Sequence, residues 1–276
     1  MFKQNIVQTA LTQDQLAFFY LGQEGFLIKY KNTYLLIDPY LSDYVDRNCS
    51  TSSLRWKRNY EPPILPTQLD FIDFVFCTHD HYDHMDPDTL ASIFKANHST
   101  KFVIPKAVFT KLLSYGIPEE NIILASANSI LSFSDFRVMP LASAHETLAI
   151  NQLGESLYLG YKFYFGSTVV YHAGDCCIYE GLEESLQNTD ILMLPINGRD
   201  YYKLENDIIG NMNILEALTL AGRISADMII PMHYDLYDVN CVNPAYFVDL
   251  IYNKFSGLKF HMFIPGEKFI YSPSVI

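Results

Sequence analysis

The sequence predicts an α+β protein in which two mixed β-sheets pack face to face and carry helices on their outer faces. In the first half, apolar strand-like runs lead into a loop crowded with histidine and aspartate and then into a helix; the second half again passes from strands to helices. With 276 residues, 49% of them hydrophobic, the chain is long enough for one large core. We therefore expect residues 1–276 to form a single domain.

Short apolar runs rich in β-branched and aromatic residues mark the expected strands. In the first half these runs are 16–21, 25–30, 33–37, 71–77, 101–105 and 122–124. In the second half they are 136–140, 158–165, 168–172, 191–195, 227–233 and 258–265. Helices are expected at 87–96, 106–115, 182–186, 214–221 and 245–255. The first of these helices has Asp86 as its N-cap and Pro87 in its first turn.

The loop that follows the strand at 71–77 holds the densest group of metal-ligand side chains. Three of the eight histidines and two aspartates fall within residues 78–84. His79 and His81, two apart at a strand end, can point to the same side and share one cation, while Asp83 and His84 turn toward a neighbouring position. Imidazole with carboxylate suits Zn, Mn, Fe or Ni rather than Ca. The spacing predicts two adjacent metal sites.

This loop, HDHYDH at 79–84, resembles the HxHxDH signature of the metallo-β-lactamase superfamily. That family has an αββα sandwich fold and usually a dinuclear metal centre. Its remaining ligands arrive as a His, an Asp and a His at the ends of later strands, and this chain offers His145 in SAHET, Asp175 in YHAGDCC and His233 in PMHYD. The resemblance covers nearly the whole chain.

The resemblance implies two divalent ions, Mn or Zn, and a place for each ligand. The expected ligands are His79, His81 and His145 for the first metal, Asp83, His84 and His233 for the second, and Asp175 as the bridge. A bridging carboxylate keeps two cations close, and a shared water of lowered pKa then becomes a hydroxide nucleophile. Asp83 and Asp175 are accordingly the catalytic candidates, Asp83 as a group that orients the hydroxide.

Four nearby residues are candidates for supporting this site. In the superfamily an acidic residue at the place of Asp38 commonly supports the metal loop, although Asp38-Pro39 is equally compatible with a strand-end turn. Thr78 and Asp80 are candidates to bind the second ring nitrogen of a ligand histidine. His172 is expected to be a core residue or to lie behind the ligands.

Further motifs resemble the branch of the superfamily that contains the ascorbate-phosphate lactonases. They are LGQEGFLI, HDHYDH, HAGD, INGRDYYKLENDIIGNM and IPMHYDLYDVN. The resemblance implies a lactonase that opens a phosphorylated or acidic sugar lactone, like an L-ascorbate-6-phosphate lactonase. Asn197, Arg199 and Tyr201 would border this anionic substrate, with Arg199 as the clamp because its planar fork binds oxyanions bidentately. A structural ion pair of Arg199 with Asp200 or Asp207 is the alternative.

Two other functions are compatible with the metal motif. Phosphodiester hydrolysis is found in the phospholipase D-like and tRNA-maturation nuclease branches of the superfamily, which share HxHxDH. A non-catalytic metal-binding protein on an inherited fold is the second alternative, but the full set of seven ligand residues weighs against it.

Composition limits which partners and which cellular compartment are expected. A net charge of −12 and a pI near 5.0 argue against a nonspecific nucleic-acid binder. The N-terminus lacks a signal-peptide pattern, and no apolar run approaches the ~20 residues of a membrane span. Five cysteines without a regular framework fit a reducing compartment. We expect a cytoplasmic protein with a small-molecule substrate and no nucleic-acid or membrane partner; whether it forms a homo-oligomer stays open.

Residues 40–68 are the longest stretch without periodicity. Four basic residues gather there around Trp56, the only tryptophan: Arg47, Arg55, Lys57 and Arg58. Long unpatterned loops in a domain are often lids or binding loops. A lid over an anionic substrate and an ordinary solvated loop are both compatible with this composition.

Overall fold

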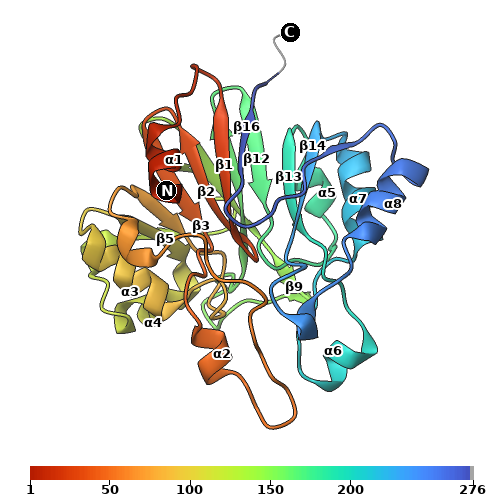
Figure 1. The fold of residues 1–276 in the computed structure, drawn as a ribbon, viewed down its shortest axis with the longest axis horizontal. Helices are drawn as coiled ribbons and strands as arrows, with labels where there is room; N and C mark the ends of the chain where they lie inside the picture. Colours follow the sequence, from red (N-terminus) through yellow and green to blue (C-terminus); the bar gives the residue numbers. More distant parts are fainter. Residues whose placement is uncertain (274–276) are drawn as a thin grey trace.

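The computed structural model describes residues 1–273 as two seven-stranded sheets packed face to face, with helices outside, which confirms the predicted fold class (Figure 1). The first sheet has the order β16 (Lys268–Tyr271), β1 (Leu16–Gly22), β2 (Gly25–Tyr30), β3 (Thr33–Ile37), β4 (Phe74–Phe76), β5 (Lys101–Pro105) and β6 (Ile122–Ala125). Strands β16 to β3 pair antiparallel, whereas β3 to β6 pair parallel.

The second sheet is mixed in the same way. Its order is β15 (Lys259–Phe260), β14 (Met228–Met232), β13 (Ile191–Pro195), β12 (Thr168–His172), β11 (Leu159–Phe165), β8 (Arg137–Ala142) and β7 (Leu131–Ser132). Strands β12 to β15 are parallel, and β12, β11, β8 and β7 are antiparallel. A separate two-stranded ribbon joins β9 (Ala144–His145) to β10 (Thr147–Leu148).

Helices cover the outer face of each sheet. Those on the first sheet are α1 (Phe2–Gln8), α3 (Pro87–Ala96) and α4 (Phe109–Ser114). Those on the second sheet are α5 (Leu182–Ser185), α7 (Ile214–Ile224) and α8 (Ala245–Lys254). Two short helices, α2 (Tyr44–Asn48) and α6 (Tyr201–Glu205), both lie at one end of the sandwich (Figure 1). Within residues 1–273, no helix combines the length and apolarity that crossing a membrane requires.

The core between the sheets is largely aromatic. Phe26 and Phe76 of the first sheet and Tyr161 and Phe163 of the second are completely buried, and the rings of Phe76 and Phe163 meet edge to face at 5.0 Å. Because sheet packs on one face and helices on the other, the central strands are buried on both faces and read as continuous apolar runs. All seven residues of β1 are buried for this reason.

Several predicted element boundaries were wrong. The run 71–77 contributes only the three residues of β4, because Phe71 ends a turn and Ile72 lies in irregular chain before the strand. The run 258–265 forms a strand over only two residues. The helix expected at 106–115 begins as a 3₁₀ turn before α4, and β16 was not predicted. Edge strands such as β16 carry a weak local pattern, since a distant strand supplies their pairing.

Candidate metal centre

All seven predicted ligand residues meet at one end of the sandwich. The loop after β4 carries four of them, β9 ends with His145, Asp175 follows β12, and His233 follows β14. The carboxyl ends of β4, β12 and β14 lie at this end, so strand order brings together residues that are far apart in sequence. His233 has a positive φ of 56°, which marks strained backbone at the site.

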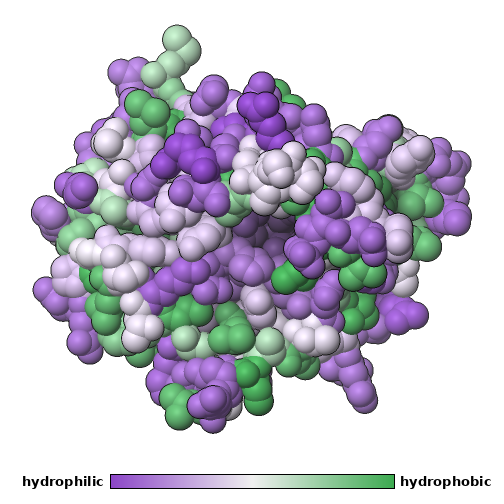
Figure 2. Space-filling view, turned by 90° about the horizontal axis from the view of Figure 1, so that it is seen from below, coloured by the Kyte–Doolittle hydropathy of each residue, from purple (hydrophilic) through white to green (hydrophobic). Residues whose placement is uncertain are grey.

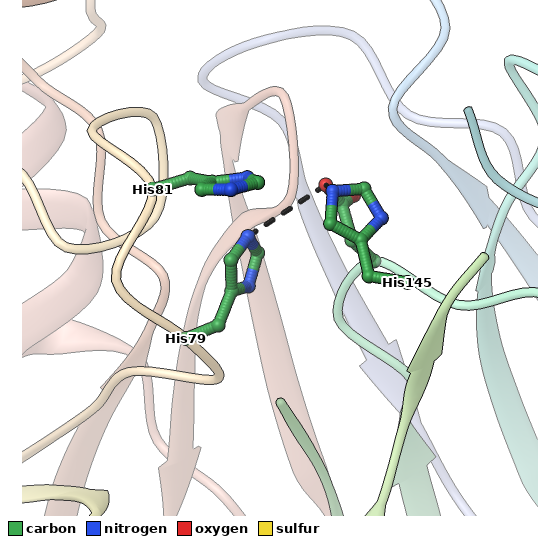
Figure 3. A group of neighbouring side chains, drawn as sticks. His79, His81 and His145 are labelled. Carbon is green, nitrogen blue, oxygen red and sulfur yellow. Dashed lines mark ion pairs between the residues drawn. The ribbon is translucent and has the colours of Figure 1, made fainter. Parts of the chain in front are cut away.

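The first group of ligands is His79, His81, His145 and Asp175. One ligand atom from each lies within 4.8 Å of the others. The Nε2 atom of His145 is 3.3 Å from Oδ2 of Asp175, and that of His79 is 3.7 Å from the same oxygen. Figure 3 shows the three histidine rings pointing toward one another. This is the geometry that a shared cation needs.

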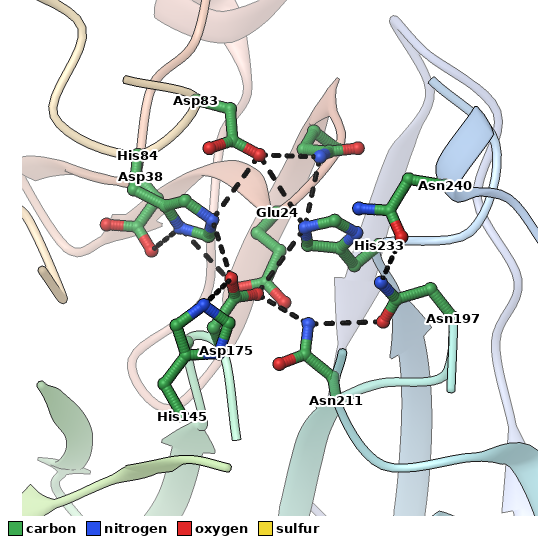
Figure 4. Close-up of polar contacts among 12 residues, drawn as sticks. Glu24, Asp38, Asp83, His84, His145, Asp175, Asn197, Asn211, His233 and Asn240 are labelled. Atoms are coloured by element: carbon green, nitrogen blue, oxygen red, sulfur yellow. Dashed lines mark hydrogen bonds and ion pairs between the residues drawn. The ribbon is translucent and has the colours of Figure 1, made fainter. Parts of the chain in front are cut away.

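The second group is Asp83, His84 and His233, again within 4.8 Å. Oδ2 of Asp83 is 3.7 Å from Nε2 of His84 and 3.6 Å from Nε2 of His233. Asp175 also faces this group, with Oδ2 at 3.5 Å from His84 and Oδ1 at 3.4 Å from His233 (Figure 4). Its carboxylate therefore lies between both groups, where a bridging ligand would be.

The chemistry of these atoms fits bound cations. The Nε2 atoms of His79 and His84 are buried, and in the described part of the chain neither has a hydrogen-bond partner. Buried polar atoms are normally paired, so such nitrogens facing carboxylates call for a ligand between them. No lysine or arginine among the described residues lies within 4.0 Å of the Asp83 or Asp175 carboxylate to supply that charge.

Residues 33–234, well over half of the chain, match the family described as Beta-lactamase superfamily domain. The chain belongs to the β-lactamase superfamily. It is 25% identical to a UPF0173 metal-dependent hydrolase of Saccharolobus solfataricus over 85% of the chain and 91% of that protein. It is also 25% identical to an uncharacterized protein of Mycobacterium tuberculosis over 81% of the chain, but the match spans only 59% of that relative.

A solved structure shares the fold of this superfamily member. It is the isothiocyanate hydrolase from Delia radicum gut bacteria, with a TM-score of 0.72 and 18% identity. The alignment covers 93% of this chain and 99% of that one. At this identity the likeness concerns the fold, and it agrees with the two-sheet architecture described above.

Asp38 anchors the metal loop of this superfamily member. Its carboxylate accepts hydrogen bonds from the backbone N–H of Thr78 at 2.8 Å and from its hydroxyl at 2.6 Å, and it lies 2.9 Å from Nδ1 of His84. The Thr78 hydroxyl is also 3.0 Å from Nδ1 of His79. Asp80 instead pairs with Lys111 at 2.9 Å. Asp38 thus fixes His84 so that Nε2 points at the second group.

Two amide side chains that we did not predict contact the carboxylates. Nε2 of Gln23 donates to Oδ2 of Asp83 at 2.9 Å and lies 3.1 Å from Nε2 of His233. Nδ2 of Asn211 donates to Oδ1 of Asp175 at 2.7 Å. Both residues occur in motifs that carry the lactonase resemblance, LGQEGFLI and INGRDYYKLENDIIGNM, which was the available signal.

Burial and the neighbouring charges set the protonation of the site. Burial would raise the pKa of Asp175, but His233 and His84 outweigh it and hold the pKa well below its usual range. Burial would lower the pKa of His84, but Asp175 and Asp83 raise it well above the ordinary value. For His145, burial dominates and lowers the pKa to about 4. Ionised carboxylates and a neutral His145 are the forms that bind a metal.

The residues expected to border the substrate lie outside the cleft above the ligands. Asn197 is buried and donates to Oδ1 of Asn240 at 2.9 Å, and it accepts from Asn211 at 3.1 Å. Arg199 donates to Glu216 at 2.5 Å and to the backbone oxygen of Asn211 at 2.7 Å. Tyr201 is 74% exposed. Arg199 thus forms a structural ion pair, with Glu216 rather than with either aspartate considered from sequence.

A cleft of about 280 Å³ opens over the two groups of ligands. Besides metal ligands, its lining includes Val45, Cys49, Trp56, Asp80, Tyr82, Lys111, Asp207, Ile208, Ile209 and Asn240. The molecule is visibly hollowed near the centre of the face seen in Figure 2. Residues 40–68 border this cleft through apolar side chains, while Arg47 pairs with Asp43 and Asp88 at the surface.

We expect the protein to bind about two divalent transition ions per chain, because seven ligands exceed the four positions of one tetrahedral ion. Elemental analysis of protein reloaded with Mn²⁺ or Zn²⁺ and then dialysed measures this number. Bound metal should also raise the melting temperature, since it offsets the repulsion between Asp83 and Asp175. His233→Ala is the control and should retain about one ion, on the first group. One tightly held ion in both proteins would contradict the prediction.

Proposed function

We propose that this chain is a metal-dependent hydrolase that opens a small lactone. The observation that carries the proposal is the convergence of seven ligand side chains, five of which line a cleft, with Asp175 facing both groups. Bound divalent ions, Mn or Zn, would supply a water of lowered pKa as the nucleophile and would polarise the carbonyl. The protein's part is to hold the ligands, orient the substrate and exclude bulk water.

Individual side chains carry these tasks. Asn211 holds one oxygen of Asp175, leaving the other to face His84 and His145. Gln23 holds Oδ2 of Asp83, which is the proposed group for orienting the attacking water. The ring of Trp56 and the side chain of Ile208 border the cleft and reduce the access of solvent to it. Lower solvent access strengthens the electrostatic interactions within the site.

The acidic sugar lactone implied by the branch resemblance is the finer part of this proposal. Lys111 is the only lysine or arginine among the described residues that line the cleft. Its ammonium pairs with Asp80 at 2.9 Å and lies 4.7 Å from the centre of the Tyr82 ring. A phosphate or carboxylate on the substrate would therefore meet Lys111, with Arg199 outside the cleft.

Matched lactone pairs test this assignment. We expect Lys111→Met to lower kcat/KM for a phosphorylated sugar lactone about fivefold, roughly 1 kcal/mol, because the cation is already shared with Asp80. The unphosphorylated lactone should be nearly unaffected. Arg199→Ala is the matched control and should leave the ratio of kcat/KM for the two lactones unchanged. A selective loss of the charged lactone in Arg199→Ala would instead restore Arg199 as the anion clamp.

A second candidate function is hydrolysis of an isothiocyanate. The apolar side of the cleft, formed by Val45, Trp56, Ile208 and Ile209, favours it, since such a substrate has an apolar body and needs no anion site. The central carbon of N=C=S is an electrophile that water can attack. Adding an aryl isothiocyanate and a phosphodiester to the lactone panel decides among these reactions. Turnover of the phosphodiester alone would favour the phosphodiesterase alternative. If no substrate is turned over, the non-catalytic metal-binding protein is favoured.

We also propose that the protein acts in the cytoplasm. The five cysteines, Cys49, Cys77, Cys176, Cys177 and Cys241, are all free. Free thiols are typical of a reducing compartment. Fractionation of the native cells with an antibody to the protein tests this location.

A further inference from the structure

Glu24 lies in a turn between β1 and β2 whose backbone is tightly held. The turn uses positive φ angles at Gly22 and Gln23, 105° and 58°. The carbonyl of Gln23 accepts from the backbone N–H of His233 at 3.0 Å, and the carbonyl of Glu24 is 2.9 Å from Nε2 of His172. These contacts tie the turn to the second sheet. The Glu24 side chain is therefore held inside the molecule.

The carboxylate of Glu24 has no partner there. The residue is 0% exposed, and in the described part of the chain neither carboxylate oxygen makes a hydrogen bond. Oε2 is 3.8 Å from Nδ1 of His84, and no described lysine or arginine comes within 4.0 Å. Burying an unpaired carboxylate is costly, and Asp38 and Asp175 nearby add repulsion. A cation next to Glu24 would remove both penalties.

The other polar groups around Glu24 are already used. Both oxygens of Asp38 bind Thr78, and one of them also binds His84. His172 accepts from the backbone N–H of Gly174 at 3.2 Å on one nitrogen and contacts the Glu24 carbonyl with the other. A separate cation site built from Asp38 and His172 would have to break these contacts. Among the groups that surround Glu24 in the described part of the chain, the metal centre remains as its partner.

Glu24 faces that centre directly. One oxygen of Glu24, one nitrogen of His84 and one oxygen of Asp175 lie within 4.8 Å of one another. In Figure 4 the Glu24 carboxylate lies beside that of Asp175. His84 and Asp175 are both expected ligands of the second metal. Glu24 therefore lies within reach of the position where His84 and Asp175 would hold the second metal.

We infer that Glu24 is an eighth ligand of the metal centre, joining it beside His84 and Asp175, and that it raises the affinity for Mn²⁺ and Fe²⁺ relative to Zn²⁺. Carboxylate oxygens and a higher coordination number suit Mn²⁺, whereas Zn²⁺ is satisfied by four ligands. The inference rests on the metal centre of the proposed function, and it is independent of the reaction and the substrate.

Glu24→Gln tests the inference through metal binding, without an activity assay. Calorimetric titration of chelator-treated protein with Mn²⁺ alone and with Zn²⁺ alone gives the two affinities. We expect the variant to lose about tenfold or more in Mn²⁺ affinity and less than about threefold in Zn²⁺ affinity. Its metal-free form should melt at a temperature no lower than the wild type, because among the described residues neither carboxylate oxygen of Glu24 has a hydrogen-bond partner to lose.

Asp86→Asn is the matched control. Asp86 is also completely buried, but its carboxylate accepts from the Thr89 hydroxyl and from the backbone N–H of Asp88. Its replacement should not raise the melting temperature and should leave both metal affinities unchanged. Unchanged Mn²⁺ affinity in Glu24→Gln would overturn the inference. So would a lower melting temperature with equal losses for both metals, which would mark Glu24 as structural. Failure to find a hydrolysed substrate would leave these readouts unaffected.

Discussion

Replacing Asp175 with alanine is expected to lower kcat/KM by about a thousandfold or more, equivalent to roughly 4 kcal/mol of lost transition-state stabilisation. Asp175 faces both ligand groups, with oxygens 3.3–3.5 Å from His84, His145 and His233. Its removal leaves these histidines without the shared carboxylate. Steady-state kinetics, together with the metal content of the variant, measures the effect.

Cys176→Ala is the matched control for that variant. Cys176 adjoins Asp175, is completely buried, and contacts the backbone oxygen of Cys177 through its Sγ at 3.2 Å. It faces the apolar core beneath the second sheet, so alanine there should change stability by about 1 kcal/mol and leave kcat/KM within a few-fold of the wild type. Equal loss of activity in both variants, with metal retained, would show that the ligand assignment is wrong.

The ligand residues were accessible from sequence because each follows an apolar run that ends in a short polar motif. Such strand ends converge when parallel strands share one edge, as β12 and β14 do on either side of β13. Asn211 follows no such run, and Gln23 follows β1 but is an amide, which is not a usual ligand of a transition metal. They reach Asp83 and Asp175 only because a turn of the first sheet and a loop of the second pack against the site. Both residues lie in motifs that can be identified from the sequence, but their contacts with the aspartates depend on the tertiary structure.

Arg199 illustrates the opposite case, in which a side chain of suitable chemistry has another partner. Asn213 and Glu216 form a capping box at the start of α7, and this box places the Glu216 carboxylate beside the guanidinium of Arg199. Sequence inspection considered Asp200 and Asp207, which are nearer in the chain. The observed pair depends on how α7 packs against the loop that carries Arg199, and no local pattern predicts that packing.

Asp38→Ala is expected to destabilise the protein by about 3–5 kcal/mol, because it leaves buried donors of Thr78 and His84 without their acceptor. Asp38 is completely buried, and its positive φ of 43° is less costly for aspartate or asparagine than for alanine. Asp38→Asn keeps one hydrogen-bond acceptor and should lose less stability than Asp38→Ala. Asp73→Ala is the control for losing one hydrogen-bonded carboxylate, since among the described residues the Asp73 carboxylate accepts only from the backbone N–H of Tyr34.

The same variant separates anchoring of the loop from binding of the metal. Nδ1 of His84 lies 2.9 Å from Asp38. Removing the Asp38 carboxylate therefore frees the imidazole ring to rotate and should lower metal affinity by about 10–100-fold. Urea unfolding of the metal-free protein measures the first effect, and metal titration of the folded variant at low temperature measures the second. A stability loss with wild-type metal affinity would mean that Asp38 supports only the turn after β3. If Asp38 fixes His84 for the metal, both stability and metal affinity should fall, and they should fall further in Asp38→Ala than in Asp38→Asn.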